Sequence, residues 1–166
     1  KGTGFLADVV ADWEAELRPL TQRRPDARVA IVRTGIVLAR QGGALAKMLP
    51  AFRLGGGGRL GTGRQYFPWI HREDMAAICE WLLDNPKARG AYNASAPAPV
   101  TNADFTSALG RALARPTVVP VPAAALKLLF GEMSELLLVS DRMLPTRLLE
   151  AGFKFRYPDL APALAA

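Results

Sequence analysis

Cysteine and histidine are almost absent from this 166-residue chain, which holds one of each, Cys79 and His71. A single thiol excludes an intramolecular disulfide and a metal site built from several thiolates. The carboxylates are scattered and do not stand with His71 at metal-ligand spacing, so we expect no metal. A Gly-x-Ser-x-Gly turn is also missing, so a Ser-His-Asp hydrolase site cannot be assembled.

Long apolar runs are missing as well. No run reaches the roughly 20 residues that a membrane-spanning helix needs, and no secretory signal precedes the first helical pattern. We therefore predict no membrane partner and a reducing, cytoplasmic setting. The chain begins with Lys1 rather than Met, so we interpret it as a piece of a longer protein, and a targeting segment lost with the start stays an alternative.

Acidic residues are fewer than basic ones, 15 against 21, and the formal net charge is +6. An excess of this sign raises nucleic acid as a partner. Most of the basic residues are arginines scattered along the chain, without a Lys/Arg run and without interleaved aromatic residues on which bases stack. We expect no nucleic-acid partner. A basic interaction module remains an alternative, and salt-sensitive DNA binding would be its signature.

The chain does contain alternating helix and strand patterns, which predict the α/β class. Apolar residues at i, i+3 and i+4 predict helices, and short β-branched runs predict buried strands of a parallel sheet. Helices are expected over residues 5–17, 45–52, 75–83, 105–113 and 123–140, and strands over 29–32, 66–71, 91–95 and 118–122. In the first helix we expect Trp13 to serve packing rather than function.

The last long helical pattern, residues 123–140, is very apolar and includes the run Leu136–Val139. Such a run is too short to cross a bilayer. We expect it to cover a partner surface, either inside this protein or between subunits, and a homodimer is the candidate assembly.

Residues 54–64, "LGGGGRLGTGR", are the glycine-rich stretch of the chain. A P-loop needs Gly-Lys-Ser/Thr opening a helix, and a dinucleotide loop needs a strand before it and a helix after it. Neither context is present, so a mobile surface loop is favoured over a phosphate cradle. Arg64 follows a Gly-Thr-Gly turn, and its guanidinium can reach an anionic ligand in a cleft.

Residues 67–76, "FPWIHREDMA", mark a change from strand to helix pattern. His71 and Asp74 are interpreted as a structural corner, in which Asp74 accepts amides of its own helix and His71 donates to a carbonyl. Catalysis by His71 is the weaker alternative. Cys79 falls on the apolar stripe of this helix and is expected to be a core thiol. Further along, Thr101 and Asp104 have the spacing of a capping box.

Four stretches together resemble a known family: "RTGIVLARQGGALAKMLPAFRLGGGG", "GTGRQYFPWIHREDMA", "YNASAPAPVTNADF" and "LPTRLLEAGFKFRYPDL". They look like the carboxyl-terminal half of an atypical extended short-chain dehydrogenase/reductase. More closely, they resemble the nucleoside-diphosphate-sugar epimerase-like family that ends in its own small carboxyl-terminal domain. The resemblance covers essentially the whole chain, in order.

The resemblance implies the carboxyl-terminal part of a Rossmann-type parallel sheet plus a small α/β substrate domain. Residues 1–40 and 72–96 would be the late part of the NAD(P)-binding domain, and residues 41–71 and 97–166 the substrate-binding, carboxyl-terminal domain. The glycine-rich nucleotide fingerprint and the active-site Tyr would lie upstream, because this chain has neither that fingerprint nor a Tyr-x-x-x-Lys. We therefore assign no catalytic residue here.

The resemblance also implies residue roles. The loop after the sixth strand, which lies against the nicotinamide in relatives, would comprise Arg33, Thr34, Gly35 and Ile36. Arg64 matches an arginine that holds the substrate diphosphate, and its neighbours Gly61, Gly63 and Gln65 would share that pocket. The pair His71 and Asp74 matches an H-x-x-D corner that is chiefly architectural in relatives.

The function that the resemblance implies is an NAD(P)-dependent epimerase or oxidoreductase acting on a nucleotide-sugar-type small molecule. NADP is favoured over NAD as the cofactor, which the missing amino-terminal half would mainly bind. This chain would contribute the substrate pocket and one wall of the nicotinamide site, and it would be inactive alone. The alternative is a non-catalytic NAD(P)-binding regulator or scaffold with the same fold.

Overall fold

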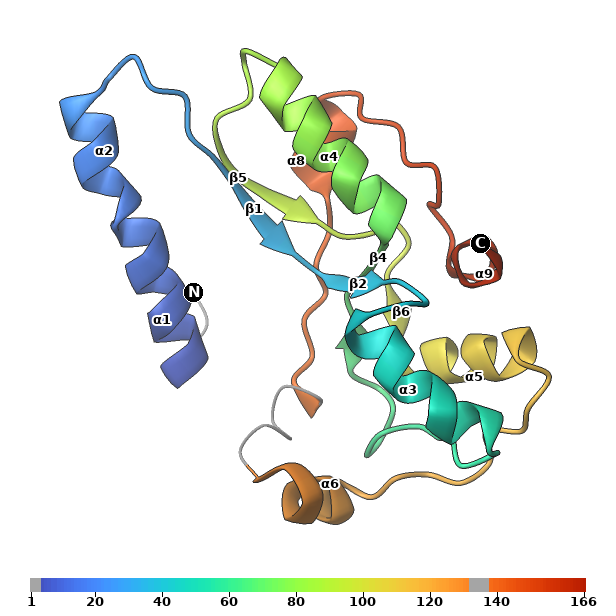
Figure 1. The fold of residues 1–166 in the computed structure, drawn as a ribbon. Coiled ribbons are helices and arrows are strands. Elements are labelled where there is room, and N and C mark those ends of the chain that lie inside the picture. The colour runs from blue at the N-terminus through green and yellow to red at the C-terminus, as the bar shows by residue number, and fades with distance from the viewer. Residues whose placement is uncertain (1–3, 132–137) are drawn as a thin grey trace.

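The computed structural model describes residues 4–131 and 138–166 and contains three pairs of strands (Figure 1). Two pairs are parallel: β1 (Ala30–Thr34) with β5 (Gly90–Ala94), and β2 (Ile36–Leu38) with β4 (Trp69–His71). The third pair, β3 (Tyr66–Phe67) with β6 (Val100–Thr101), is antiparallel. Parallel strands joined by helices are the arrangement that the alternating pattern predicts.

Gly35 is the point at which the chain passes from one parallel pair to the other. Its N–H donates to Ala94 O at 2.9 Å, and the next N–H, of Ile36, donates to Pro68 O at 2.6 Å. A Cβ at position 35 would lie 2.9 Å from Pro68 O and 3.3 Å from Ala94 O. Only glycine allows the backbones to approach this closely, so one residue couples β1–β5 to β2–β4.

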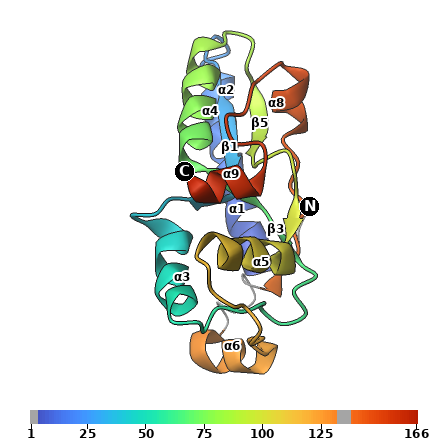
Figure 2. The same cartoon turned by 90° about the vertical axis from the view of Figure 1, so that its right-hand side faces the viewer.

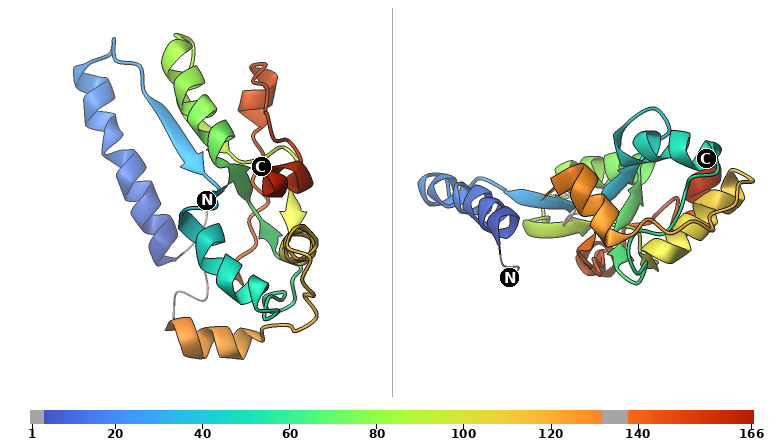
Figure 3. Two further views of the ribbon diagram at one scale, coloured as in Figure 1. Left: turned by 45° about the vertical axis from the view of Figure 1, so that its right-hand side comes forward. Right: turned by 90° about the horizontal axis from the view of Figure 1, so that it is seen from below.

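The first two helices, α1 (Phe5–Ala15) and α2 (Leu17–Arg23), form an arm at one side of the molecule (Figures 1 and 3). Their large apolar side chains are exposed: 80% of Phe5 and 72% of Trp13 is accessible to solvent. The expectation that Trp13 packs is therefore wrong within the described residues, because no described segment covers this face.

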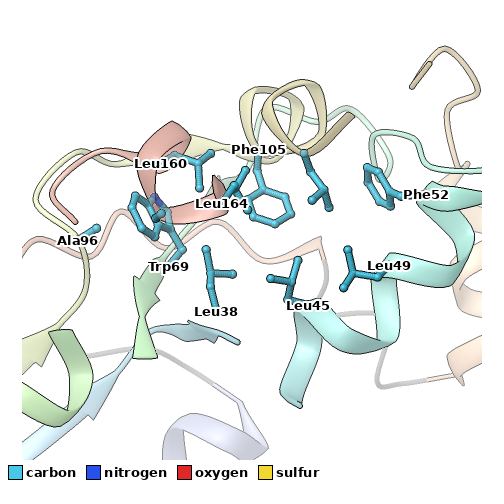
Figure 4. Packing of buried hydrophobic residues seen from close by; sticks show 11 residues of the cluster. Leu38, Leu45, Leu49, Phe52, Trp69, Ala96, Phe105, Leu160 and Leu164 are labelled. Carbon is cyan, nitrogen blue, oxygen red and sulfur yellow. The ribbon is translucent and has the colours of Figure 1, made fainter. Parts of the chain in front are cut away.

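One hydrophobic cluster lies between α3 (Gly43–Arg53), α5 (Asn102–Ala112) and α9 (Leu160–Ala165). Figure 4 shows Trp69 and Phe105 directed towards leucines from α3 and α9. The buried members are Leu38, Leu45, Leu49, Phe52, Trp69, Ala96, Phe105, Leu109, Leu160, Ala163 and Leu164. The carboxyl-terminal helix α9 is thus part of the core that supports β2 and β4.

The second cluster packs α4 (Arg72–Asp84) and α8 (Thr146–Glu150) against β5. Its buried members are Ile70, Ile78, Leu82, Ala88, Tyr92, Ala94, Leu148 and Phe153. Leu148 and Phe153 come from the range assigned to the second domain, yet they pack among residues assigned to the first. The domain boundaries themselves stay a prediction.

Cys79 is exposed, so the expectation of a core thiol is wrong. The buried positions of α4 are Asp74, Ile78 and Leu82, which follow one another at intervals of four. Cys79 lies one residue after Ile78 and is therefore turned by about 100° away from that line. The sequence pattern therefore predicted this helix correctly but wrongly counted Cys79 among its buried residues.

The capping box predicted at the start of α5 is confirmed. The Asp104 N–H donates to Thr101 Oγ1 at 3.2 Å, and the Thr101 N–H donates to the Asp104 carboxylate at 3.1 Å. The Thr101 hydroxyl also donates to this carboxylate, at 2.6 Å, and lowers the pKa of Asp104 below its ordinary value.

The glycine-rich stretch is not a surface loop along its whole length, because Gly57, Gly58 and Gly63 are buried. A Cβ at Gly58 would overlap Val119 O. The predicted strand over 118–122 is reduced to a single bridge between Leu60 and Val121, which pins this loop from the other side. The loop is thus a packed element of defined shape.

The predicted helix over residues 123–140 is described only in part. It begins as α6 (Ala123–Phe130), and residues 132–137, which hold part of the Leu136–Val139 run, lie outside the described residues. Within residues 4–131 and 138–166, none of the helices combines the length and the apolar character needed to cross a membrane.

Candidate functional site

The Gly-Thr-Gly turn before Arg64 forms one side of a pocket of about 440 Å³. Gly61 and Gly63 adopt φ angles of 56° and 70°, which favour glycine. The Thr62 hydroxyl accepts from the Arg64 N–H at 3.3 Å and closes the turn. The pocket is lined by Gly61, Thr62, Arg64, Gln65, Ala123, Leu138 and Ser140.

The Arg64 side chain is exposed and lines this pocket. Among residues 4–131 and 138–166, no carboxylate or carbonyl pairs with its guanidinium, whereas Arg33 and Arg156 each form an ion pair with a glutamate. Its five N–H donors are therefore free to bind a ligand oxygen, and carboxylate and phosphate groups fit this planar fork.

Gln65 is buried and supports the loop from within. Its Nε2 donates to Leu60 O at 3.0 Å, and its backbone carbonyl accepts from the Asn102 N–H at 2.8 Å. Asn102 in turn accepts from the Leu60 N–H through its Oδ1, at 2.8 Å. These hydrogen bonds fix the loop on the first turn of α5.

Three of the four residues expected in the substrate pocket, Gly61, Arg64 and Gln65, line the same space. Gly63 lies behind it: it is buried, and its carbonyl accepts from the Ala103 N–H at 2.9 Å. The structure thus places Gly63 in the turn that orients Arg64 and not in the pocket wall.

The rest of the wall comes from Ala123, Leu138 and Ser140, which are distant in sequence, and hydrogen bonds hold the chain that follows Leu138. Ser140 Oγ accepts from the Tyr66 N–H at 3.1 Å, and Ser95 Oγ donates to Met143 O at 3.1 Å. Asn93 Nδ2 donates to Leu144 O, also at 3.1 Å. Sequence analysis missed the wall residues Ala123, Leu138 and Ser140, because a helical pattern carries no signal of which distant loop it faces.

The residues expected at the nicotinamide lie elsewhere, at the carboxyl end of β1. Arg33 forms a two-pronged ion pair with Glu14 of α1, with both N–O distances 2.7 Å. Hydrogen bonding to Arg33 lowers the pKa of Glu14 and raises that of Arg33 itself. Neither these two side chains nor Thr34, Gly35 and Ile36 line the Arg64 pocket.

His71 is the N-cap of α4, and its Nδ1 accepts from the Glu73 N–H at 3.3 Å. The expected donation from His71 to a carbonyl is therefore replaced by acceptance. Only 6% of the residue is exposed, and its ring packs on Tyr157 with centroids 4.0 Å apart. Burial disfavours the charged imidazolium and lowers the pKa of His71 below its ordinary value.

Asp74 is 1% exposed and does not bind amides of its own helix, as the sequence pattern suggested. Its two oxygens accept from the backbone N–H groups of Arg156 and Tyr157 at 2.7 and 2.9 Å. The carboxylate therefore fastens the chain before α9 to the first turn of α4. The assignment of His71 and Asp74 as structural residues stays a prediction.

No three His, Cys, Asp or Glu side chains of the described segments gather closely enough to hold a metal ion. The expected absence of a metal site remains a prediction.

Comparisons of the sequence and of the fold with known proteins find similar proteins among the epimerases. Epimerase family protein Mb2239 from Mycobacterium bovis is 46% identical over 164 residues, which are 98% of this chain and 54% of that protein. A crystal structure of the human epimerase family protein SDR39U1 (isoform 2) with NADPH has a TM-score of 0.81 and 41% identity, covering 84% of this chain and 48% of its own.

A crystal structure of the nucleoside-diphosphate sugar epimerase from Corynebacterium glutamicum has a TM-score of 0.74 and 34% identity. The match covers 99% of this chain and 31% of that one. The family described as "Domain of unknown function (DUF1731)" matches residues 121–166. That this last part is a small domain of its own stays a prediction.

The fold class is confirmed: the chain is α/β with parallel strand pairs, and the solved structures that it matches are Rossmann-fold epimerases. It is similar to epimerase family proteins, as the sequence resemblance indicated. The chain spans about half the length of the curated relatives it matches.

Proposed function

We propose that the intact protein is an NAD(P)-dependent epimerase or oxidoreductase that acts on a nucleotide-sugar-type substrate. This chain supplies the substrate pocket beside Arg64 and one wall of the nicotinamide site, with NADP favoured as cofactor. The human relative was crystallised with NADPH, which supports the choice of cofactor. The bound cofactor supplies hydride transfer, and the acid/base tyrosine is expected upstream of this chain.

The observation that carries this proposal is the Arg64 guanidinium, which has no acceptor among residues 4–131 and 138–166 and lines a pocket of about 440 Å³. In a nucleotide sugar, a doubly charged diphosphate links a nucleoside to a sugar whose ring has an apolar face. The pocket offers the matching surfaces: Leu138 and Ala123 are apolar, while Arg64 provides charge. Ser140 Oγ accepts from Tyr66, so its own O–H remains available to donate to a substrate oxygen.

At the nicotinamide wall, the proposed contribution of Arg33 is indirect. Glu14 already binds its guanidinium, which neutralises the charge and fixes the side chain against α1. The part left to face a cofactor is the chain from Thr34 to Ile36, at the carboxyl end of β1, where ligands bind in open α/β sheets. Arg33 would therefore position this loop rather than contact the cofactor.

The test compares Arg64→Ala with Arg59→Ala in the intact protein. Both arginines belong to the same loop, but Arg59 lines a separate pocket beside α5. Loss of a charge-assisted hydrogen bond costs about 1.5–3 kcal/mol, so Arg64→Ala should weaken nucleotide-sugar binding by roughly 10- to 150-fold. Isothermal titration calorimetry with a panel of nucleotide sugars measures this, and thermal melting checks that folding is unchanged.

Equal affinities of the two variants for every nucleotide sugar would reject the diphosphate role of Arg64. A protein that binds NADP but neither binds nor converts any member of the panel would instead favour the non-catalytic regulator or scaffold. Turnover by residues 1–166 alone with added NADP would contradict the expectation that this chain is inactive by itself. The cytoplasmic setting and the homodimer remain predictions.

A further inference from the structure

A second pocket, of about 160 Å³, lies at the carboxyl ends of the parallel strands β2 and β4. The last residues of these strands, Leu38 and His71, are paired in register, and both line the pocket. The chain turns directly from β4 into α4, and α9 lies beside that end of the helix (Figures 1 and 2). The lining shares no residue with that of the Arg64 pocket.

The geometry of this pocket suits an anion. Ligands in open α/β sheets bind outside the carboxyl ends of parallel strands, and the amino end of a helix carries a partial positive charge. The 13-residue helix α4 begins here at Arg72. Strand ends and helix dipole therefore coincide at one place.

His71 is the independent observation that points to a ligand. Only 6% of this residue is exposed, and it is one of the residues that line the pocket. Nδ1 accepts from the Glu73 N–H, so the neutral ring carries its proton on Nε2. No described residue accepts a hydrogen bond from Nε2, and this N–H is the donor that the ring offers to a ligand.

Two arginines also line the pocket, with Gln41, the apolar residues Leu45, Ala163 and Leu164, and the last residue, Ala166. Arg40 donates to Ala165 O at 2.9 Å, and Arg72 donates to Gln41 Oε1 at 2.9 Å. Each guanidinium has five N–H donors, so each keeps donors for a ligand after these bonds hold it in place. Glu73 also lines the pocket, but Arg156 binds its carboxylate at 2.7 Å.

We propose that this pocket is a second, anion-binding site that takes a small oxyanion, phosphate being the best match to its size and donors. The site is distinct from the proposed substrate pocket and does not depend on the proposed function. The ligand would accept from His71 Nε2 and the guanidinium groups of Arg40 and Arg72. A volume of about 160 Å³ admits one phosphate group and excludes a whole nucleotide sugar.

The experiment titrates inorganic phosphate into the intact protein at constant ionic strength, with chloride as the balancing anion. The readout is the ring signal of His71 in isotope-labelled protein, assigned by its loss in His71→Asn. Phosphate, and not chloride, should shift the signal saturably. It should also raise the pKa of His71, because a nearby anion favours the imidazolium. The charges that already face this ring are Glu73, Asp74, Arg72 and Arg156.

The matched variants separate the two pockets. Arg40 and Arg72 are exposed, so Arg40→Gln with Arg72→Gln leaves the core intact and should weaken the phosphate response by about tenfold or more. Arg64→Gln should leave it unchanged. A response that chloride reproduces, or that survives in the Arg40→Gln, Arg72→Gln variant, would overturn the proposal.

Discussion

His71 illustrates how much of a residue's role depends on its surroundings. As the single histidine of the chain, it invites a catalytic interpretation. In the structure it caps α4 and packs on Tyr157, and only 6% of the residue is exposed. These contacts support a structural role for the ring, and the anion site proposed above uses its Nε2, which has no acceptor among the described residues.

Replacement of His71 by alanine should lower the free energy of unfolding by about 1–3 kcal/mol, because the partly buried Glu73 N–H loses its acceptor. His71→Asn should retain most of the stability, since asparagine is a preferred N-cap. Urea unfolding of the intact protein measures both changes. A fully stable but inactive His71→Ala protein would refute the structural assignment.

The lowered pKa of His71 also predicts a pH dependence. Above the unfolded value of 6.5, the ring is neutral in both states. As the pH falls below 6.5, the unfolded chain binds a proton before the folded one does, so stability decreases until the folded pKa is passed. The charges facing the ring are Glu73, Asp74, Arg72 and Arg156.

The measurement is the difference in unfolding free energy between wild type and His71→Asn, taken between about pH 7.5 and 5. Histidines elsewhere in the intact protein cancel in this difference. Wild type should lose more stability than the variant as the medium becomes acidic. Parallel pH profiles would show that burial does not depress this pKa.

At the scale of elements, Asp74 joins α4 to the carboxyl-terminal segment. Two backbone N–H groups, of Arg156 and Tyr157, depend on its carboxylate. We expect Asp74→Ala to destabilise the docking of α9 by about 3 kcal/mol or more, because two partly buried backbone donors lose a charged acceptor. Hydrogen exchange at the amides of Arg156 and Tyr157 should accelerate far more than exchange in β1.

The matched control is Glu73→Gln. Its carboxylate pairs with Arg156 in an ion pair whose arginine side chain is 73% exposed, and exposed pairs contribute about 0–1 kcal/mol. Exchange near α9 should therefore change little in this variant. If Asp74→Ala and Glu73→Gln behave alike, Asp74 is not the residue that holds the chain before α9 on α4.

At the scale of the whole molecule, Gly35 couples the two parallel pairs and thereby the two hydrophobic clusters. A Cβ there meets backbone oxygen at 2.9 Å, which side-chain rotation cannot relieve. We expect Gly35→Ala to cost about 1–3 kcal/mol and to lower the melting temperature of the intact protein. Gly42→Ala is the control, because a Cβ at that position meets nothing within 4 Å.

Equal melting temperatures for Gly35→Ala and Gly42→Ala would show that the passage from β1 to β2 tolerates a side chain. The coupling would then have to come from the hydrophobic clusters and not from the close backbone approach.

Sequence patterns correctly predicted the features that depend on residues close together in the chain. The α/β class, the helices α3, α4 and α5, and the capping box of Thr101 and Asp104 follow from side chains within one or two turns of each other. The position of Arg64 after a tight turn was also readable, because glycines at positive φ define that turn. These features were correct since they depend on near neighbours alone.

Only the tertiary structure decided the rest. It brought Ser140 to the Arg64 pocket, joined Asp74 to backbone groups 82 and 83 residues away, and left Cys79 in solvent. Each outcome depends on which distant segments meet, and the hydrophobic effect that drives them together is non-directional. The sequence by itself therefore determined the elements and their caps, whereas packing between distant elements selected the residues that face each pocket.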